Sequence, residues 1–459
     1  MDILLLLANS FIFYGIGYSV LSSHEFGNEF LGVFTLCNAV LHSIVSVIIY
    51  RQKLADRNLF YLVSGLVLVF VTMAIPVQLD GNWVTLLWVG EAALLFWIGR
   101  TKNMSVYEYL SYPLMALATF SLYQDWSTVY VNFYQFEGFK TFTPLLNSHF
   151  LSTVLFVTGF GFIHYLYNNK LYEAAMQSKK ELSNLVSIII PAIIISTVYF
   201  GFYFEISHYF QTLFQESEVT INQYEHTNNY DLLKFKTIWL LIYSMVFASA
   251  LSVINMKFIK NKTLGHINIG LNGLVVFVFL TSGLYMLSEL RENYLDVNPS
   301  QYYEIGAFHI IIRYISFMFL AVILFVTYKY IQETFMSFTK KILFSILFHI
   351  TMVWVLSSEL IHVMDLSGST QSHKLGLSIF WGLYALYLIA LGIWKKKKYL
   401  RMAAITLFSI TLIKLFFYDI SHLGTLSKTI VFVSLGILLL IISFLYNKFK
   451  TSISDDVED

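Results

Sequence analysis

Long apolar stretches constrain this chain more than any other feature of its sequence. A helix of roughly 20 apolar residues crosses a bilayer core about 30 Å thick, and about 14 stretches of that length follow one another here. Runs such as 62–70 lack the alternation of outer-membrane β-strands. The predicted fold is an all-α, polytopic transmembrane bundle with spans near 3–21, 30–50, 59–79, 82–99, 106–124, 148–167, 184–204, 235–256, 264–287, 305–328, 337–361, 375–394, 401–420 and 427–446.

The composition excludes several classes of soluble protein. Hydrophobic residues make up 57% of the chain and charged residues 12%, which leaves too little polar surface to cover soluble domains. A net charge of +1 gives no basic footprint for nucleic acid. The sequence has no phosphate-cradling Gly-rich loop, so we expect no nucleotide. Cys37 is the single cysteine, which excludes an intrachain disulfide and an iron–sulfur cluster. We expect no cofactor.

The positions of the basic residues predict the orientation. The even-numbered connections between spans carry 21 of the 29 Lys and Arg residues, and basic residues stay on the cytoplasmic side. Both termini are therefore predicted to be cytoplasmic, and the loops 125–147 and 205–234 to face outward. We expect one multi-helix membrane domain over 1–450, followed by a disordered acidic tail over 451–459.

Two hairpins far apart in the chain resemble each other. Trp88 is followed eleven residues later by Gly99, then by a basic turn, an outgoing helix and Asp125. Trp381 is followed at the same interval by Gly392, and then by the same features and Asp419. This spacing predicts an internally repeated hairpin unit.

Acidic residues recur where outgoing helices reach the predicted outer side. Exclusion of Lys and Arg from that side explains acids there in general, yet the helix macrodipole disfavours a carboxylate at a helix C-terminus. We therefore also consider an outer acidic ring that binds partners, cations or a ligand. Its members are Asp80, Asp125, Glu205, Glu289, Glu359 and Asp419.

Three charged residues lie inside predicted spans, where a charge costs about 2.5–3.5 kcal/mol on insertion scales. Their depths, at 1.5 Å per residue, place Glu91, Arg313 and Lys414 in the outer half of the bilayer. One hypothesis is a buried charged site that handles a substrate or a proton. The other is an internal ion pair that stabilises helix packing.

An acid followed three residues later by His presents both groups on one helix face, as in di-iron bundles. The pattern occurs at Glu205/His208, Glu359/His362 and Asp419/His422. A metal site also requires these helices to converge, so we expect none, with Glu359, His362, Asp419 and His422 as the residues to examine.

Two segments carry a family resemblance. The first is Ile75-Pro76-Val77-Gln78-Leu79-Asp80-Gly81-Asn82-Trp83-Val84-Thr85-Leu86-Leu87-Trp88-Val89-Gly90-Glu91. The second is Leu412-Ile413-Lys414-Leu415-Phe416-Phe417-Tyr418-Asp419, followed by Leu435-Gly436 and Phe444-Leu445-Tyr446. They resemble a bacterial predicted-membrane-protein family, domain of unknown function 2339, and in particular the C-terminal portion of its members. The resemblance implies a multi-pass protein of the bacterial inner (cytoplasmic) membrane. It gives prominence to Pro76, Asp80, Trp88, Glu91, Lys414 and Asp419, and it supplies no reaction.

Three functions remain open at this point. The favoured one is a transporter or flippase-like protein whose polar site in the outer half of the bilayer handles a small solute or a cell-envelope lipid. The second is a membrane-embedded transferase that acts on lipid-linked sugars or acyl groups at the extracytoplasmic face, with Asp80, Asp125, Glu359 or Asp419 as general base or metal ligand. The third is a scaffold whose buried charges pair internally. Membrane lipids are expected partners in all three.

Overall fold

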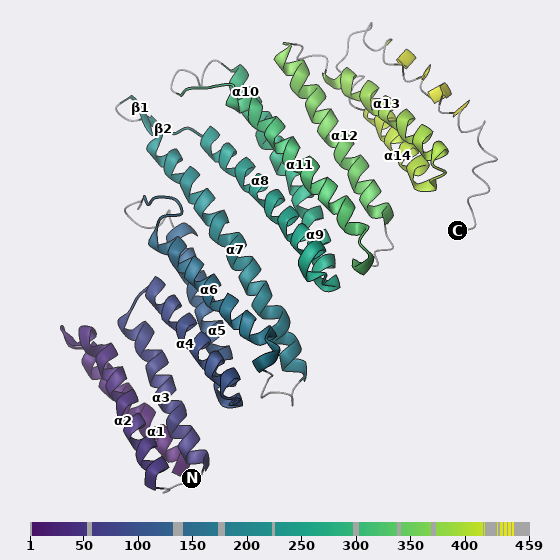
Figure 1. Cartoon of the computed structure of the whole chain (residues 1–459). Coiled ribbons are helices and arrows are strands. Elements are labelled where there is room, and N and C mark those ends of the chain that lie inside the picture. The colour runs from purple at the N-terminus through teal and green to yellow at the C-terminus, as the bar shows by residue number, and fades with distance from the viewer. Residues whose placement is uncertain are drawn as a thin grey trace. The chain divides into compact units, whose positions relative to one another are not determined.

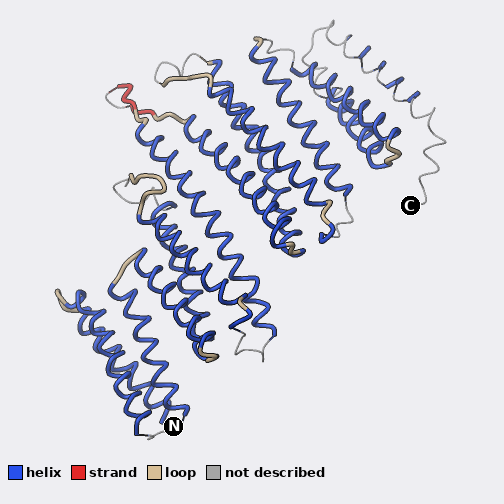
Figure 2. The backbone as a smooth tube through the Cα atoms, in the orientation of Figure 1, coloured by secondary structure: helices blue, strands red, loops and turns tan. Residues whose placement is uncertain are grey.

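The computed structural model describes most of the chain as helices (Figures 1 and 2). The described residues are all except 1, 53–56, 132–140, 173–179, 223–224, 297–302, 337–340, 369–372, 416, 418–428, 430–431, 435, 438, 442 and 445–459. They divide into two compact units, Met1–Tyr209 and Phe210–Asp459.

The first unit holds helices α1 to α6 and most of α7. Its elements are α1 (Asp2–Ser22), η1 (Gly27–Phe30), α2 (Leu31–Gln52), α3 (Arg57–Gln78), α4 (Asn82–Thr101), α5 (Ser105–Trp126), the π-helical turn η2 (Ser127–Val131), α6 (Ser148–Asn168), η4 (Lys170–Tyr172) and α7 (Lys180–Glu216).

The second unit begins near the end of α7. Its elements are β1 (Val219–Asn222), β2 (Glu225–Thr227), α8 (Asp231–Ile254), η5 (Asn255–Ile259), α9 (Lys262–Val278), η6 (Phe279–Gly283), α10 (Leu284–Leu295), α11 (Phe308–Ile331), η8 (Thr334–Met336), α12 (Lys341–Leu366), α13 (His373–Trp394) and α14 (Lys398–Lys414). The strands form a short antiparallel hairpin, shown in red in Figure 2, inside the loop that the charge pattern predicts to face outward.

The helices confirm the predicted fold class. Ten helices among the described residues are long and apolar enough to cross a membrane. The span predicted near 264–287 corresponds to α9 and α10 joined by the π-helical turn η6. The end of the span near 401–420 and parts of the span near 427–446 lie outside the described residues, as does the predicted acidic tail.

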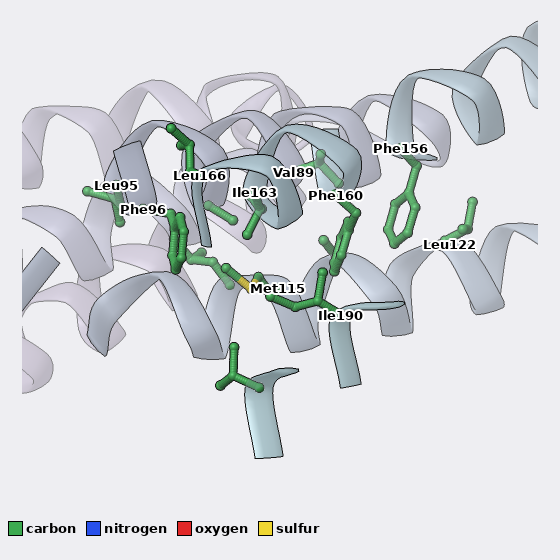
Figure 3. Packing of buried hydrophobic residues seen from close by; sticks show 14 of the residues in the cluster. Val89, Leu95, Phe96, Met115, Leu122, Phe156, Phe160, Ile163, Leu166 and Ile190 are labelled. Atoms are coloured by element: carbon green, nitrogen blue, oxygen red, sulfur yellow. The ribbon is translucent and has the colours of Figure 1, made fainter. Parts of the chain in front are cut away.

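The core of the first unit is built by α4, α5, α6 and α7 (Figure 3). Phe96 from α4 and Phe156 and Phe160 from α6 are fully buried, and Met115 of α5 lies among them. In a bilayer this packing acts through van der Waals contact rather than through exclusion of water, because lipid tails are as apolar as the side chains.

The α4–α5 hairpin is packed closely enough to require glycine next to its turn. A Cβ atom on Gly99 would lie 2.7 Å from the backbone nitrogen of Glu108. The turn itself places Asn103 at φ 52°, and the backbone N–H of Met104 donates to the carbonyl of Gly99 at 2.9 Å. Small residues at such crossings let two backbones approach.

The α13–α14 hairpin repeats this geometry. A Cβ atom on Gly392 would lie 3.0 Å from the backbone nitrogen of Arg401. Arg401 follows Gly392 by nine residues, the same interval that separates Glu108 from Gly99. Lys396 takes φ 52°, and the N–H of Lys397 donates to the carbonyl of Gly392 at 2.9 Å. The similarity seen between the two sequences therefore reflects the same backbone turn.

Polar pairs at matching positions cross both hairpins. Thr85 lies three residues before Trp88 in the sequence, and Ser121 lies 33 residues after it. Their hydroxyl oxygens are 2.7 Å apart. At the same intervals from Trp381, Lys414 donates to Ser378 at 3.0 Å. The neutral pair Thr85 and Ser121 in the α4–α5 hairpin thus corresponds to a pair that contains the cation Lys414 in the α13–α14 hairpin.

The close packing predicts the effect of adding one methyl group to α4. Gly99→Ala should lower the thermal unfolding midpoint in detergent, because the new Cβ overlaps the backbone of α5 and overpacking costs about 1–3 kcal/mol. Gly90→Ala is the matched control, since nothing lies within 4 Å of its Cβ position. Equal midpoints for the two variants would contradict the close approach.

Candidate functional site

A buried ion pair links α11 to α12. Arg313, 1% exposed, donates through Nε to Glu359 Oε2 at 2.7 Å and through Nη2 to Ser358 Oγ at 2.8 Å. The Tyr314 hydroxyl donates to the other oxygen of Glu359 at 3.0 Å. The guanidinium also lies over the Phe317 ring, 5.1 Å from its centroid. The predicted intramembrane charge Arg313 therefore pairs with a member of the predicted outer ring.

A second arginine lies in the same region. Arg291 of α10 is 3% exposed, and its Nη2 lies 2.8 Å from Asp365 Oδ2 on α12 and 3.4 Å from Glu292 Oε1. The buried Nε and Nη1 atoms of Arg291 and the Nη1 atom of Arg313 have no hydrogen-bond partner in the described part of the chain. The two arginines thus keep buried N–H donors with unused hydrogen-bonding capacity.

His362 completes this group of side chains. It is 1% exposed, and neither ring nitrogen has a hydrogen-bond partner among the described residues. Its ring meets that of Tyr314 edge-on, with centroids 6.2 Å apart. A buried imidazole without partners is costly, so it suits a position that a ligand completes. We call Arg291, Arg313, Glu359, His362 and Asp365 the α10–α12 polar cluster.

A large cavity of about 840 Å³ lies beside this cluster. Its walls come from η6, α10, α12, α13 and α14, and most of the side chains lining it are apolar. Along α12 it extends from Ile346 to Ile361, about 22 Å at 1.5 Å per residue. The hydroxyls of Ser288, Ser357 and Ser358 are among its lining groups.

Ser358 connects the cavity to the cluster. It lines the cavity and accepts the hydrogen bond from Arg313. Ser357 accepts a hydrogen bond at 2.8 Å from Trp381, which also lines the cavity. The Nζ of Lys414 lies over the ring of this tryptophan, 5.9 Å from its centroid. A long apolar space therefore has cationic groups close to its wall.

The third intramembrane charge, Glu91, lies on α4 in the first unit, whereas Arg313 and Lys414 belong to the second. It accepts a hydrogen bond from Thr72 of α3 at 3.0 Å. The meeting of all three charges in the outer half of the bilayer stays a prediction.

The members of the predicted outer ring differ in their surroundings. Asp80 is exposed, Asp125 accepts from Thr85 at 2.7 Å, and Glu289 lies 3.8 Å from Lys234. Asp419 and His422 lie outside the described residues. Convergence of the ring stays a prediction.

Glu205 has a structural role instead. It is 2% exposed and accepts from the Tyr130 hydroxyl at 2.7 Å, the Leu145 backbone N–H at 2.7 Å and the Asn147 amide at 2.9 Å. Burial and the Glu205 carboxylate raise the pKa of the Tyr130 hydroxyl, so it remains a donor. His208, one turn along, stacks on Phe142 at 3.8 Å. This carboxylate holds the loop before α6 against α7.

No group of three or more His, Cys, Asp or Glu side chains in the described residues has a metal-binding arrangement. Of the residues singled out for metal, Glu359 is occupied by Arg313.

Two charged residues of the cluster, Arg291 and Asp365, are not among the site residues predicted from the sequence. Arg291 lies just past the span predicted near 264–287, on the side from which Lys and Arg are largely excluded. An arginine that breaks this charge rule was the available signal. Asp365 had no comparable signal, because its role depends on the packing of α10 against α12.

Comparison with known protein families assigns the chain to one of them. A family described as predicted membrane protein (DUF2339) matches residues 4–449. The chain belongs to this family. The match covers nearly the whole chain and confirms the family resemblance seen in the sequence. No curated protein and no solved structure matches the chain.

The Arg313–Glu359 pair predicts a non-additive stability cycle. Arg313→Met should destabilise this DUF2339 protein by about 3–5 kcal/mol, because Glu359 is left without its counter-charge. Adding Glu359→Gln should recover most of that loss, since both charges are then gone. The measurement is denaturant unfolding in detergent for the single and double variants. Additive effects would show that the two residues act independently.

Proposed function

We propose that this protein is a transporter of flippase type that binds a cell-envelope lipid with an anionic headgroup in the α10–α14 cavity. The observation that carries the proposal is the contact between a long apolar cavity and a buried arginine through Ser358. An amphiphile needs both an apolar space for its chain and a polar end for its headgroup.

Charge complementarity supports the anionic headgroup. Arg313 and Arg291 each have a buried N–H donor without a partner among the described residues, and Arg is well suited to bind phosphate and carboxylate oxygens. A zwitterionic or neutral headgroup would leave these donors less well satisfied.

The dimensions of the cavity support a lipid chain rather than a small polar solute. A length of about 22 Å along α12 is comparable to most of the hydrocarbon core of a bilayer. The lining supplies few polar groups along that length. The polar cluster lies near the helix ends that the charge pattern assigns to the outer side, so the proposed headgroup site faces outward in the bacterial inner membrane.

Lipid binding should depend on headgroup charge. Native mass spectrometry of the detergent-purified protein should show retention of phosphatidylglycerol over phosphatidylcholine, and glycerol phosphate should not displace the lipid. The double variant Arg313→Met/Glu359→Gln, which keeps the fold, should bind phosphatidylglycerol about tenfold or more weakly, since hydrogen bonds to charged groups contribute about 1.5–3 kcal/mol. Equal retention of both lipids by the parent protein would count against an anionic headgroup.

Filling the cavity tests the apolar part of the site. Ala403→Phe places a ring in the cavity lining and should abolish lipid retention and movement of a labelled anionic lipid between leaflets of proteoliposomes. Met402→Phe, at a neighbouring position 59% exposed and outside the lining, is the control and should retain both. Retained activity in Ala403→Phe would place the lipid elsewhere.

His362 favours a second function, a transferase that acts on a lipid-linked donor. A general base needs a ring nitrogen free to accept a proton, and both nitrogens of His362 lack partners in the described residues. His362→Gln separates the two functions. Gln still offers hydrogen-bonding groups to a headgroup but cannot act as a general base. A transferase would therefore lose turnover of a lipid-linked sugar or acyl donor, whereas a flippase would keep lipid movement.

A further inference from the structure

Glu91 lies deep in α4 with one of its two oxygens unsatisfied. It is nine residues past Asn82, the first residue of the helix, which corresponds to about 14 Å along the axis. Oε1 accepts the hydrogen bond from Thr72, whereas Oε2 is buried and has no hydrogen-bond partner among the described residues.

No counter-charge for Glu91 lies among the described residues. Its neighbours one turn away on the same helix, Leu87, Leu94 and Leu95, are apolar, and of these only Leu95 is buried. No ion pair within the described residues includes Glu91.

The charged and titratable groups with described side chains on the neighbouring helices lie toward the helix ends or hold other partners. At one end of α4, Arg100 pairs with Glu108 of α5 at 2.8 Å, nine residues or about 14 Å from Glu91. Toward the other end, Asp125 of α5 is bound to Thr85, six residues or about 9 Å away. The histidines of α6 bond near its two ends, His149 to Asn82 and His164 to Asn168. No charge in the described part of α3 faces Glu91.

A carboxylate without a counter-charge is costly in hydrocarbon, and a buried acid avoids the cost by taking up a proton. Glu108 shows the contrast within the same hairpin, because it is 0% exposed yet lies beside Arg100. Two glutamates in one unit therefore meet opposite conditions: Glu108 lies beside a cation near the hairpin turn, and Glu91 lies mid-helix without a cation among the described residues.

We propose that Glu91 is a proton-binding site, held as a neutral carboxylic acid in the membrane and reactive toward hydrophobic carbodiimides. The inference does not rest on the proposed lipid function, because that function involves the second unit only. A carbodiimide adds to a protonated carboxyl: the acid O–H adds across one C=N bond, and the adduct rearranges to a stable N-acylurea without a leaving group. An ionised carboxylate lacks the proton that this addition requires.

The experiment uses the full chain in detergent or nanodiscs and dicyclohexylcarbodiimide as probe, with peptide mass spectrometry as readout. We expect N-acylurea on Glu91 at neutral pH, less of it as the pH is raised, and none on Glu108. Labelling of Glu108 and Glu91 to the same extent would overturn the proposal, because burial alone would then explain reactivity.

Infrared spectroscopy of the unlabelled protein removes the dependence on reagent access. The spectrum of the parent protein minus that of Glu91→Gln should contain the carbonyl band of a protonated carboxylic acid, shifted on exchange into heavy water. The unfolding midpoint of Glu91→Gln is measured first, to show that the variant folds like the parent protein. If the difference spectrum at neutral pH then lacks the band, Glu91 is ionised and the proposal is overturned. The conservative variant keeps the volume and the Thr72 hydrogen bond, so it is expected to fold.

Discussion

Satisfaction of polar groups in a medium without water is the constraint on which this structure depends. A charge inside the bilayer must find a partner within the protein, because lipid offers none. Arg100 with Glu108 in the first unit and Arg313 with Glu359 in the second meet this demand by joining neighbouring helices. Such pairs contribute specificity more than net stability, since desolvation offsets much of their attraction.

The two similar hairpins show how one backbone design carries two chemistries. Glycine at the turn allows the helices of each hairpin to approach closely, and this part is common to both. The polar position between the helices has diverged, from Thr85 and Ser121 in one copy to Ser378 and Lys414 in the other. The cationic copy is the one that forms a wall of the large cavity.

The groups with unsatisfied hydrogen-bonding capacity support both proposals made for this protein. Arg291, Arg313 and His362 retain donors or acceptors beside an apolar cavity, a combination that suits an amphiphile with an anionic headgroup. Glu91, in the first unit, has no counter-charge among the described residues, which suits the proposed proton-binding site. Glu205, by contrast, has its hydrogen bonds filled by a loop, so its burial is structural.

The sequence by itself determined the membrane class, most spans and the repeated hairpin, because hydropathy and residue spacing act locally along a helix. It also identified Glu91, Arg313 and Lys414 as charges inside spans, and Glu359 as an acid near the end of an outgoing helix. Only the tertiary structure decided that Arg313 pairs with Glu359, that Arg291 and Asp365 join them, and that a cavity lies alongside. These contacts join residues 46 or more positions apart, and their geometry depends on how helices cross, which no local pattern encodes.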